Sequence, residues 1–175
     1  MVSNIIDSDT VQRLVDESAI RQVIATYNRG IDRLDAELLA SVYHPDGIDD
    51  HGALFTGLGR KYAPFIVAHH KRTADATMHC TMNSSIDLDG DVAYVETYFF
   101  YVERKVKDGK PTVGYAGGRY VDRFERRDGK WAIAHRVAVR EWDEIRVGAE
   151  PLIPEGVFTA GLRSRDDISY ARKAD

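Results

Sequence analysis

Apolar residues in the first third of the chain recur every three or four positions. Between residues 11 and 31 this spacing places them along one face of an α-helix, which Asp9 or Thr10 can cap. Asp35 can cap a shorter second helix. The segment 44–47, His-Pro-Asp-Gly, ends that helix, because proline cannot continue the hydrogen-bond ladder. The pattern therefore predicts two successive helices with apolar faces turned inward.

A third helix and a series of strands follow. Residues 48–56 predict a short strand, and Tyr62, Phe65 and Ile66 predict a helix after it. Beyond Thr77 the apolar period changes from that of a helix to the alternation of strands. Asp-Gly pairs at 89–90, 108–109 and 128–129 divide this half of the chain, and Asp-Gly between alternating runs is a strong hairpin signal.

Gly114, Gly117 and Gly118 interrupt the strand predicted for residues 113–127. Glycine inside a strand marks a bend or a bulge, so we expect a strongly curved sheet. An apolar helix laid across its concave side would enclose a cavity, and function is to be sought there. The predicted fold is α+β, with three N-terminal helices packed on a strongly curved antiparallel sheet.

Length and composition fit one such domain. The chain has 175 residues, of which 43% are hydrophobic and 30% charged, as in ordinary globular proteins. We expect the domain to span residues 1–147. Residues 148–175 form a C-terminal tail without clear periodicity, which either covers a pocket or a neighbouring subunit or remains partly disordered.

Charge and cysteine content narrow the classes of partner. The net charge of −4 argues against nucleic acid or an anionic membrane as the main partner. One cysteine, Cys80, allows no intrachain disulfide, which suits a reducing cytoplasm. Residues 1–9 lack the layout of a signal peptide. We therefore expect a cytoplasmic protein that acts on a small molecule.

Several kinds of site are not indicated by the sequence. It lacks a G-x-S-x-G serine motif, a phosphate-binding glycine loop and an H-E-x-x-H zinc motif. His44-Pro45-Asp46 has the spacing of two metal ligands, and Asp49-Asp50-His51 is a second cluster, but the first lies on a turn where solvated side chains are normal. We expect no metal site. Cys80 alternates with His79 along a strand, so the two point to opposite faces, and Cys80 is expected in the core.

The face that carries His79 is ambiguous in isolation, because it can point into water or into the cavity. A longer series of motifs weighs for the cavity. Tyr27 precedes Asp32 by five residues, and the succession then continues in a fixed order through Asp35, Leu38-Leu39, Tyr43, Pro45-Asp46, residues 78–83 (Met-His-Cys-Thr-Met-Asn), residues 88–93 (Leu-Asp-Gly-Asp-Val-Ala), residues 117–120 (Gly-Gly-Arg-Tyr), residues 128–133 (Asp-Gly-Lys-Trp-Ala-Ile) and Arg136.

This succession, over roughly residues 9–145, resembles the SnoaL-like branch of the nuclear-transport-factor-2 (NTF2-like) superfamily. The resemblance implies an α+β cone that is a homo-oligomer, a dimer or trimer, through the outer face of its sheet. Its lyase members, such as scytalone dehydratase, bile-acid 7α-dehydratase and lindane dehydrochlorinase, use a His–Asp pair without a cofactor. Other relatives cleave hydroxylated diarylpropanes from lignin and release formaldehyde. Asp32 and His79 match the pair, Tyr27 a helix tyrosine and Arg136 an arginine of the last strand.

The matched residues suit an elimination. His79 is the expected base, because imidazole exchanges a proton near neutral pH, and Asp32 would orient its ring. Tyr27 would donate a hydrogen bond to the leaving or developing oxygen, and Arg136 would stabilise its negative charge. Each residue also has a structural interpretation: Asp32 as a turn cap, Tyr27 as core, Arg136 as the cross-strand partner of Glu96 or Asp122.

Aromatic residues would line the pocket and favour a phenolic or polycyclic substrate. The candidates are Tyr43, Phe65, Tyr98, Phe100, Tyr101 and Tyr115. The sequence thus predicts a cofactor-independent lyase of aromatic-compound catabolism, which removes water or formaldehyde from a hydroxylated aromatic or polycyclic substrate. An isomerase using the same base remains open, as does a noncatalytic module like the small subunit of ring-hydroxylating oxygenases.

Overall fold

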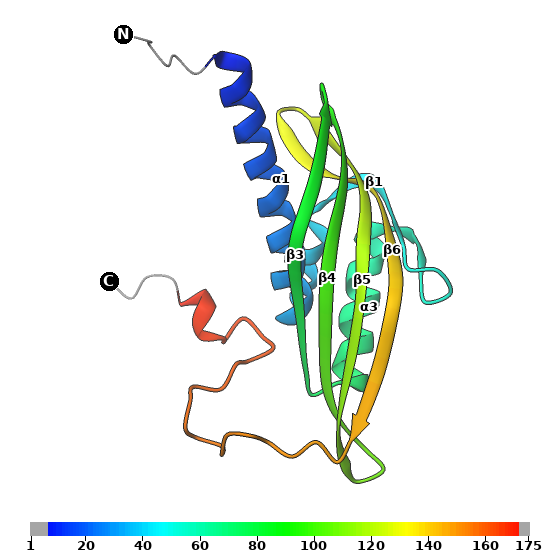
Figure 1. The fold of residues 1–175 in the computed structure, drawn as a ribbon, viewed down its shortest axis with the longest axis vertical. Coiled ribbons are helices and arrows are strands. Elements are labelled where there is room, and N and C mark those ends of the chain that lie inside the picture. The colour runs from blue at the N-terminus through cyan, green and yellow to red at the C-terminus, as the bar shows by residue number, and fades with distance from the viewer. Residues whose placement is uncertain (1–6, 172–175) are drawn as a thin grey trace.

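The computed structural model of the protein describes residues 7–171. Its sheet has the strand order β2-β1-β6-β5-β4-β3, and all neighbours are antiparallel except β1 and β6, which are parallel. Three helices pack against it, so the predicted α+β fold is confirmed (Figure 1). The elements are α1 (Ser8–Asp32), α2 (Ala36–Ala40), β1 (Tyr43–Asp50), β2 (Thr56–Leu58), α3 (Gly59–Thr73), β3 (Ala76–Asp89), β4 (Val92–Lys107), β5 (Lys110–Arg127), β6 (Lys130–Val147) and the 3₁₀ turn η1 (Ile168–Tyr170).

The helix starts follow from their caps. The Asp7 carboxylate accepts a hydrogen bond from the Thr10 amide at 2.7 Å, so α1 begins slightly earlier than predicted. Asp35 caps α2 as predicted, with Leu38 N–H as the donor. The first turns of α1 project beyond the sheet and leave three of the predicted core residues exposed: Val11, Leu14 and Val15. No helix within residues 7–171 is long and apolar enough to cross a bilayer.

The three Asp-Gly pairs form the hairpin turns between the four long strands. Gly90, Gly109 and Gly129 have φ of 58°, 73° and 73°, and Asp108 and Asp128 have φ of 51° and 52°. The consecutive positive φ values at 108–109 and 128–129 are those of the type I′ turn. In the first hairpin the two loop residues are Gly90 and Asp91, and positive φ at the first of them alone is that of the type II′ turn. The meander predicted from these pairs is therefore confirmed, with strands that reach up to the turns.

The segment predicted as a helix-ending turn is instead the start of strand β1. Tyr43 pairs with Ile133 and Ile48 with His135 on the parallel strand β6, and the register shifts between them. Pro45 lies in this irregular stretch, where its missing N–H breaks no regular ladder. Tyr43, which we expected at the end of α2, thus belongs to the sheet.

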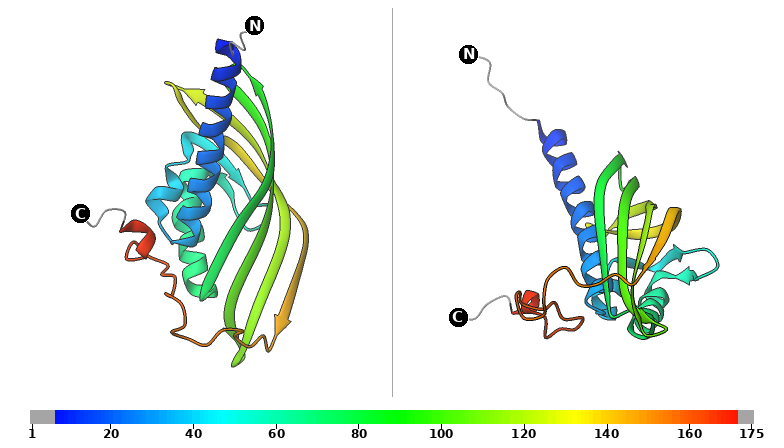
Figure 2. Two further views of the ribbon diagram at one scale, coloured as in Figure 1. Left: turned by 60° about the vertical axis from the view of Figure 1, so that its left-hand side comes forward. Right: turned by 60° about the horizontal axis from the view of Figure 1, so that its bottom comes forward.

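The sheet bends around the helices and holds the core between them (Figure 2). Register shifts occur between Gly117 and Gly118 of β5 and between Thr81 and Ser84 of β3, so the predicted bend at the glycines is confirmed. The buried cluster includes Ile20, Ile24, Tyr27, Ile31, Leu39, Val42, Tyr43, Tyr62, Ala63, Ile66, Ala93, Val95, Tyr120, Phe124, Trp131 and Ile133.

The tail after β6 runs back to the helices (Figure 1). The Arg165 guanidinium donates two hydrogen bonds of 2.9 Å to the Asp35 carboxylate, and the Tyr170 hydroxyl donates a third at 3.0 Å. The Arg29 guanidinium lies 4.2 Å from the centre of the Tyr170 ring. Arg163 donates to the carbonyl of Ala74 at the end of α3. These contacts fix the end of the tail on the α1–α2 corner.

Gly47 offers a test of the packing between β1 and β6. A Cβ at this position would lie 2.5 Å from the Ile133 carbonyl oxygen, which is backbone and cannot move aside. Gly47→Ala is therefore expected to lower the free energy of unfolding in urea by about 1–3 kcal/mol. Gly57→Ala is the matched control, since its Cβ would meet only the Phe55 ring at 3.4 Å. Equal stability of the two variants would contradict this account of β1.

Candidate functional site

A cavity of about 310 Å³ lies between the concave face of the sheet, the end of α1 and helix α3. Its wall is largely apolar and aromatic, with several titratable side chains among the apolar ones. Such a composition is typical of small-molecule sites. The lining residues are Ile31, His51, Leu54, Tyr62, Ile66, His69, His70, His79, Phe99, Tyr101, Glu103, Ala116, Tyr120, Ala138, Val139 and Arg140.

Asp32 and His79 lie in direct contact at one side of this cavity. The Asp32 Oδ1 atom is 2.7 Å from His79 Nδ1, and Asp32 Oδ2 accepts the His79 backbone N–H at 2.9 Å. The side chains are 11% and 8% exposed, so the pair is largely shielded from water. One carboxylate thus fixes both the ring and the backbone of His79.

The geometry leaves the other ring nitrogen of His79 available. Within residues 7–171, His79 Nε2 has no hydrogen-bond partner. The ring packs against Tyr101, with 4.6 Å between centroids, and pairing of His79 with Tyr101 across β3 and β4 sets both on the concave face. The face that was ambiguous in the sequence therefore points into the cavity.

His70 adds a second imidazole beside this pair. Its ring centroid is 6.0 Å from that of His79, and its Nδ1 is buried without a partner among the described residues. Burial, reinforced by the neighbouring His79 and His69, lowers the pKa of His70 to about 3. A neutral imidazole with an unused nitrogen is thus held at the cavity wall.

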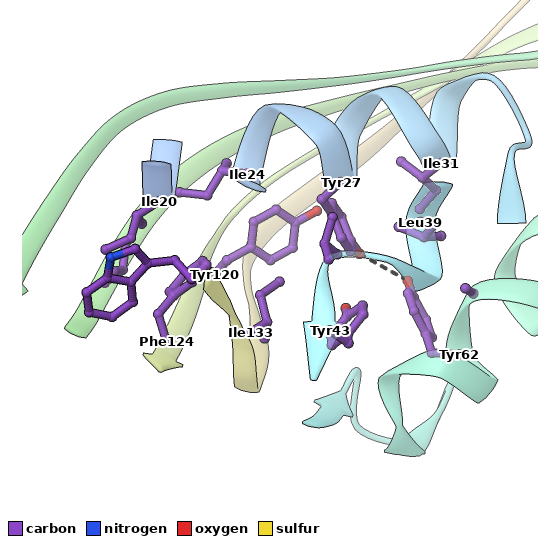
Figure 3. Close-up of a cluster of buried hydrophobic side chains, with 14 of the residues drawn as sticks. Ile20, Ile24, Tyr27, Ile31, Leu39, Tyr43, Tyr62, Tyr120, Phe124 and Ile133 are labelled. Atoms are coloured by element: carbon purple, nitrogen blue, oxygen red, sulfur yellow. Dashed lines mark hydrogen bonds between the residues drawn. The ribbon is translucent and has the colours of Figure 1, made fainter. Parts of the chain in front are cut away.

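Tyr27 lies behind the cavity wall. Its side chain is fully buried, and its hydroxyl donates to the Tyr62 oxygen at 3.4 Å (Figure 3). Burial raises the pKa of both hydroxyls well above the ordinary value, so both remain protonated. Tyr62, which does line the cavity, is therefore the tyrosine through which Tyr27 can act.

Arg136 is paired with Asp122 in the core. Two hydrogen bonds of 2.8 and 2.7 Å join the guanidinium to the carboxylate, and both side chains are completely buried. The guanidinium lies 4.2 Å from the Tyr27 ring centre and 4.1 Å from that of Tyr120. Burial alone would lower the pKa of Arg136, but the Asp122 carboxylate raises it well above the ordinary value. The structural interpretation of Arg136 fits this geometry, and the residue does not line the cavity.

The six aromatic residues predicted to line a pocket lie at different places relative to this cavity. Of the six candidates, Tyr101 lines the cavity. Phe65 is partly exposed beside Phe55, and Tyr43 is buried with its hydroxyl on Asp49. The other three lie on the outer face of the sheet, because their positions alternate with Phe99, Tyr101 and Ala116: Tyr98, Phe100 and Tyr115.

The wall residues that were not recognised as site residues from the sequence include Phe99, Tyr120 and His51. Phe99 and Tyr120 stack with 4.6 Å between ring centroids. The register of the β3–β4 turn, extended along the strands, would pair His79 with Val102 and put Phe100 on the same face. The register shift between Thr81 and Ser84 pairs His79 with Tyr101 and brings Phe99 to the cavity instead, and nothing in the sequence indicated this shift. His51 lies just after β1, and from the sequence it was considered only as part of the cluster 49–51 with metal-binding residue types.

Cys80 and the residues considered as possible metal ligands have different surroundings in the structure. Cys80 pairs with Phe100 on the outer face of the sheet and is only partly buried, so its predicted core position is wrong. His44 bonds to the Glu125 carbonyl oxygen at 2.9 Å. Within the described part of the chain, no group of three or more His, Cys, Asp or Glu side chains has an arrangement suited to a metal ion.

The Arg136–Asp122 pair gives a stability prediction. Asp122→Ala leaves a buried guanidinium without its counter-charge, so the free energy of unfolding should fall by about 3–5 kcal/mol. Urea denaturation checks this. Arg119→Gln, which breaks a partly exposed pair with Glu96 on the outer face, should change stability little. A small effect of Asp122→Ala would show that Arg136 is satisfied in another way.

The lowered pKa of His70 predicts a pH dependence of stability. The unfolded chain takes up a proton at His70 as the pH falls below about 6.5, whereas the folded protein does so only near pH 3. As the pH falls between these two values, the free energy of unfolding of the wild type should therefore decrease relative to that of His70→Gln. Urea unfolding at several pH values measures the difference. His135→Gln, at an exposed histidine, should run parallel to the wild type. A constant difference between wild type and His70→Gln would contradict the burial argument.

Comparisons with known proteins agree with this architecture. The model of the SnoaL-like domain family matches residues 12–137. A protein provisionally named a scytalone dehydratase, from Novosphingobium aromaticivorans, superposes with a TM-score of 0.69 at 23% identity, covering 83% of this chain and 99% of its own. A hexachlorocyclohexane dehydrochlorinase from Novosphingobium barchaimii superposes with a TM-score of 0.73 at 18% identity, covering 82% of this chain and 99% of its own.

A third structure, provisionally named an aromatic ring hydroxylase and also from Novosphingobium aromaticivorans, has a TM-score of 0.66 at 18% identity and covers 77% of this chain and 94% of its own. A search of curated proteins found no significant match. At these identities the superpositions show the fold alone. The family model covers most of the chain, and the chain therefore belongs to the SnoaL-like domain family.

Proposed function

We propose that the protein is a cofactor-independent lyase that eliminates water, or water and formaldehyde, from a hydroxylated aromatic or polycyclic compound. One observation carries the proposal: the His79 ring is held by Asp32 through Nδ1 and turns its unpartnered Nε2 toward an aromatic cavity. A carboxylate on one imidazole nitrogen fixes the tautomer in which the other nitrogen accepts a proton. This is the arrangement of a general base.

In the elimination, His79 Nε2 takes a proton from the substrate. The electron pair of the broken C–H bond forms the new double bond, and the C–O bond breaks with its pair on the departing oxygen. Asp32 stabilises the imidazolium, and the largely shielded site strengthens that interaction. General-base catalysis of this kind contributes roughly 10²–10⁴-fold to a rate.

The same site suits release of a carbon unit. With a phenolic diarylpropane diol, loss of the benzylic hydroxyl as water gives a quinone methide. Removal of the proton of the primary alcohol then allows the C–C bond to break, and formaldehyde leaves. The released electron pair enters the quinone methide and restores the aromatic ring, which gives a stilbene. Substrate, products and electrons balance without an oxidant.

The wall of the cavity supports an aromatic substrate. Tyr101, Phe99 and Tyr120 offer flat apolar surfaces on one side, and the His–Asp pair lies on the same concave face. Among the structural neighbours are proteins named for dehydration and dehydrochlorination, both of which are eliminations. Tyr27 and Arg136 act indirectly in this proposal, by supporting Tyr62 and Tyr120 from behind the wall.

The first experiment measures turnover of a panel of hydroxylated diarylpropanes and polycyclic alcohols by wild type, His79→Gln and Asp32→Asn. New conjugated absorbance, water loss by mass spectrometry and released formaldehyde are followed. Both variants should lose about 10²-fold or more in kcat, because one removes the base and the other removes the carboxylate that orients it. His135→Gln should keep the wild-type rate.

The outcomes separate the classes of function. Elimination by the wild type that survives both substitutions would show that another group is the base. A product of unchanged mass with a moved double bond would identify an isomerase that uses the same base. Tight binding of panel compounds without any turnover would favour a noncatalytic binding module.

A further inference from the structure

A second carboxylate–imidazole pair opens onto the same cavity. Asp49 of β1 is completely buried, and its Oδ1 lies 2.5 Å from Nδ1 of His51. The other carboxylate oxygen accepts the Tyr43 hydroxyl at 2.5 Å. The His51 side chain is 16% exposed and forms part of the cavity wall. One carboxylate oxygen thus holds the His51 ring, and the other is held by Tyr43.

The second nitrogen of His51 is not free, which distinguishes it from His79. His51 Nε2 lies 3.2 Å from the Tyr62 hydroxyl oxygen, and the two rings stack with 4.6 Å between centroids. Tyr62 in turn accepts from Tyr27 at 3.4 Å (Figure 3). A chain of hydrogen bonds therefore runs from Asp49 through His51 to the hydroxyl of Tyr62 at the cavity wall.

The direction of this chain depends on the protonation of His51. When Nδ1 carries the single proton of a neutral ring, it donates to Asp49, and the Tyr62 O–H donates to Nε2. When the ring is doubly protonated, Nε2–H donates to the Tyr62 oxygen instead. The Tyr62 O–H group, still protonated, can then point toward the cavity. A proton on His51 thereby presents a hydroxyl donor to a bound molecule.

Packing alone does not require this arrangement. Burying a carboxylate next to an imidazole has a desolvation cost, and apolar side chains of the same volume fill a core at least as well. Burial, reinforced by the charge of Asp49, raises the pKa of Tyr62 well above the ordinary value. Tyr62 therefore gives up its proton only as it receives another, and His51 lies at hydrogen-bond distance to supply it.

We propose that Tyr62 protonates the departing oxygen of the substrate, with His51 as its proton source and Asp49 as the residue that positions His51. The inference rests on the function proposed above and specifies its substrate class. A hydroxide ion leaves poorly and needs a proton, whereas a chloride ion does not. A second proton-transfer group in the same cavity as a base therefore fits an alcohol as substrate rather than a halide.

The proton balance is complete. His79 takes the proton from carbon, the C–O bond breaks, the departing oxygen takes the Tyr62 proton, and Tyr62 takes one from His51 Nε2. The products are an alkene and water. His79 is left with one proton more and His51 with one fewer, and exchange with water after product release restores both.

A pair of substrates tests the proposal: the best alcohol from the panel and its analogue with chloride at the same carbon. Tyr62→Phe and His51→Gln should lower kcat for the alcohol by about 10²-fold or more, with KM little changed, and should leave elimination of chloride within a few-fold of wild type. His79→Gln should lower both rates. His135→Gln should lower neither.

Different results would overturn the inference about Tyr62 and the proposed function. Equal losses for alcohol and chloride in Tyr62→Phe and His51→Gln would show a structural role and overturn the inference while the base assignment stands. Activity of His79→Gln equal to wild type would overturn the proposed function instead.

A measurement without turnover completes the test. In ¹⁵N-histidine-labelled protein, both nitrogens of the His51 ring should give hydrogen-bonded signals, Nδ1 with Asp49 and Nε2 with Tyr62, and Tyr62→Phe should change the Nε2 signal. An Nε2 signal that Tyr62→Phe leaves unchanged would show that no proton passes between the two groups, and this result would overturn the proposal even if no panel compound reacts.

Discussion

A single buried guanidinium joins helix to sheet in this protein. Arg136 of β6 lies between the Tyr27 ring of α1 and the Tyr120 ring of β5, each about 4 Å from the charge, and Asp122 neutralises it. A charge with no access to water must be paired and surrounded in one geometry. The position of α1 over the concave face therefore depends on Arg136, and so does the position of Asp32 at the end of that helix.

The two carboxylate–imidazole pairs use this framework differently. Asp32 lies on a helix and His79 on a strand, so their distance depends on how α1 packs on the sheet. Asp49 and His51 are two residues apart, and their contact is local. We therefore expect the first pair to be the more sensitive to changes in the core. The cavity that both imidazoles line is closed by tyrosine and phenylalanine rings from strands β4 and β5 and helix α3.

Much of this arrangement follows from the sequence by local rules. The Asp-Gly pairs define the hairpins, Asp35 caps α2, and Gly117 and Gly118 mark the bend, because each depends on backbone geometry within a few residues. The contact of Asp32 with His79 was expected only through the family resemblance. It joins residues 47 positions apart, and no periodicity gives such a distance.

The errors have two physical sources. Alternation along a strand gives two faces but not which one is concave, so Phe100 was chosen where Phe99 lines the cavity. The first half of strand β1, residues 43–47, was missed because Pro45 and Gly47 read as a turn, although a parallel partner, β6, accepts them at a register shift. Asp49 and His51 were therefore considered only as possible metal ligands.

Strand β3 is the last strand of the sheet, and a bare sheet edge offers its N–H groups to any extended chain. At His79 the donor is already taken, since Asp32 Oδ2 accepts that N–H while Oδ1 holds the ring. The carboxylate that orients the imidazole thus also prevents another strand from pairing with this N–H group. A substitution that removes this carboxylate would cost the protein some of its resistance to aggregation as well as the group that orients its base.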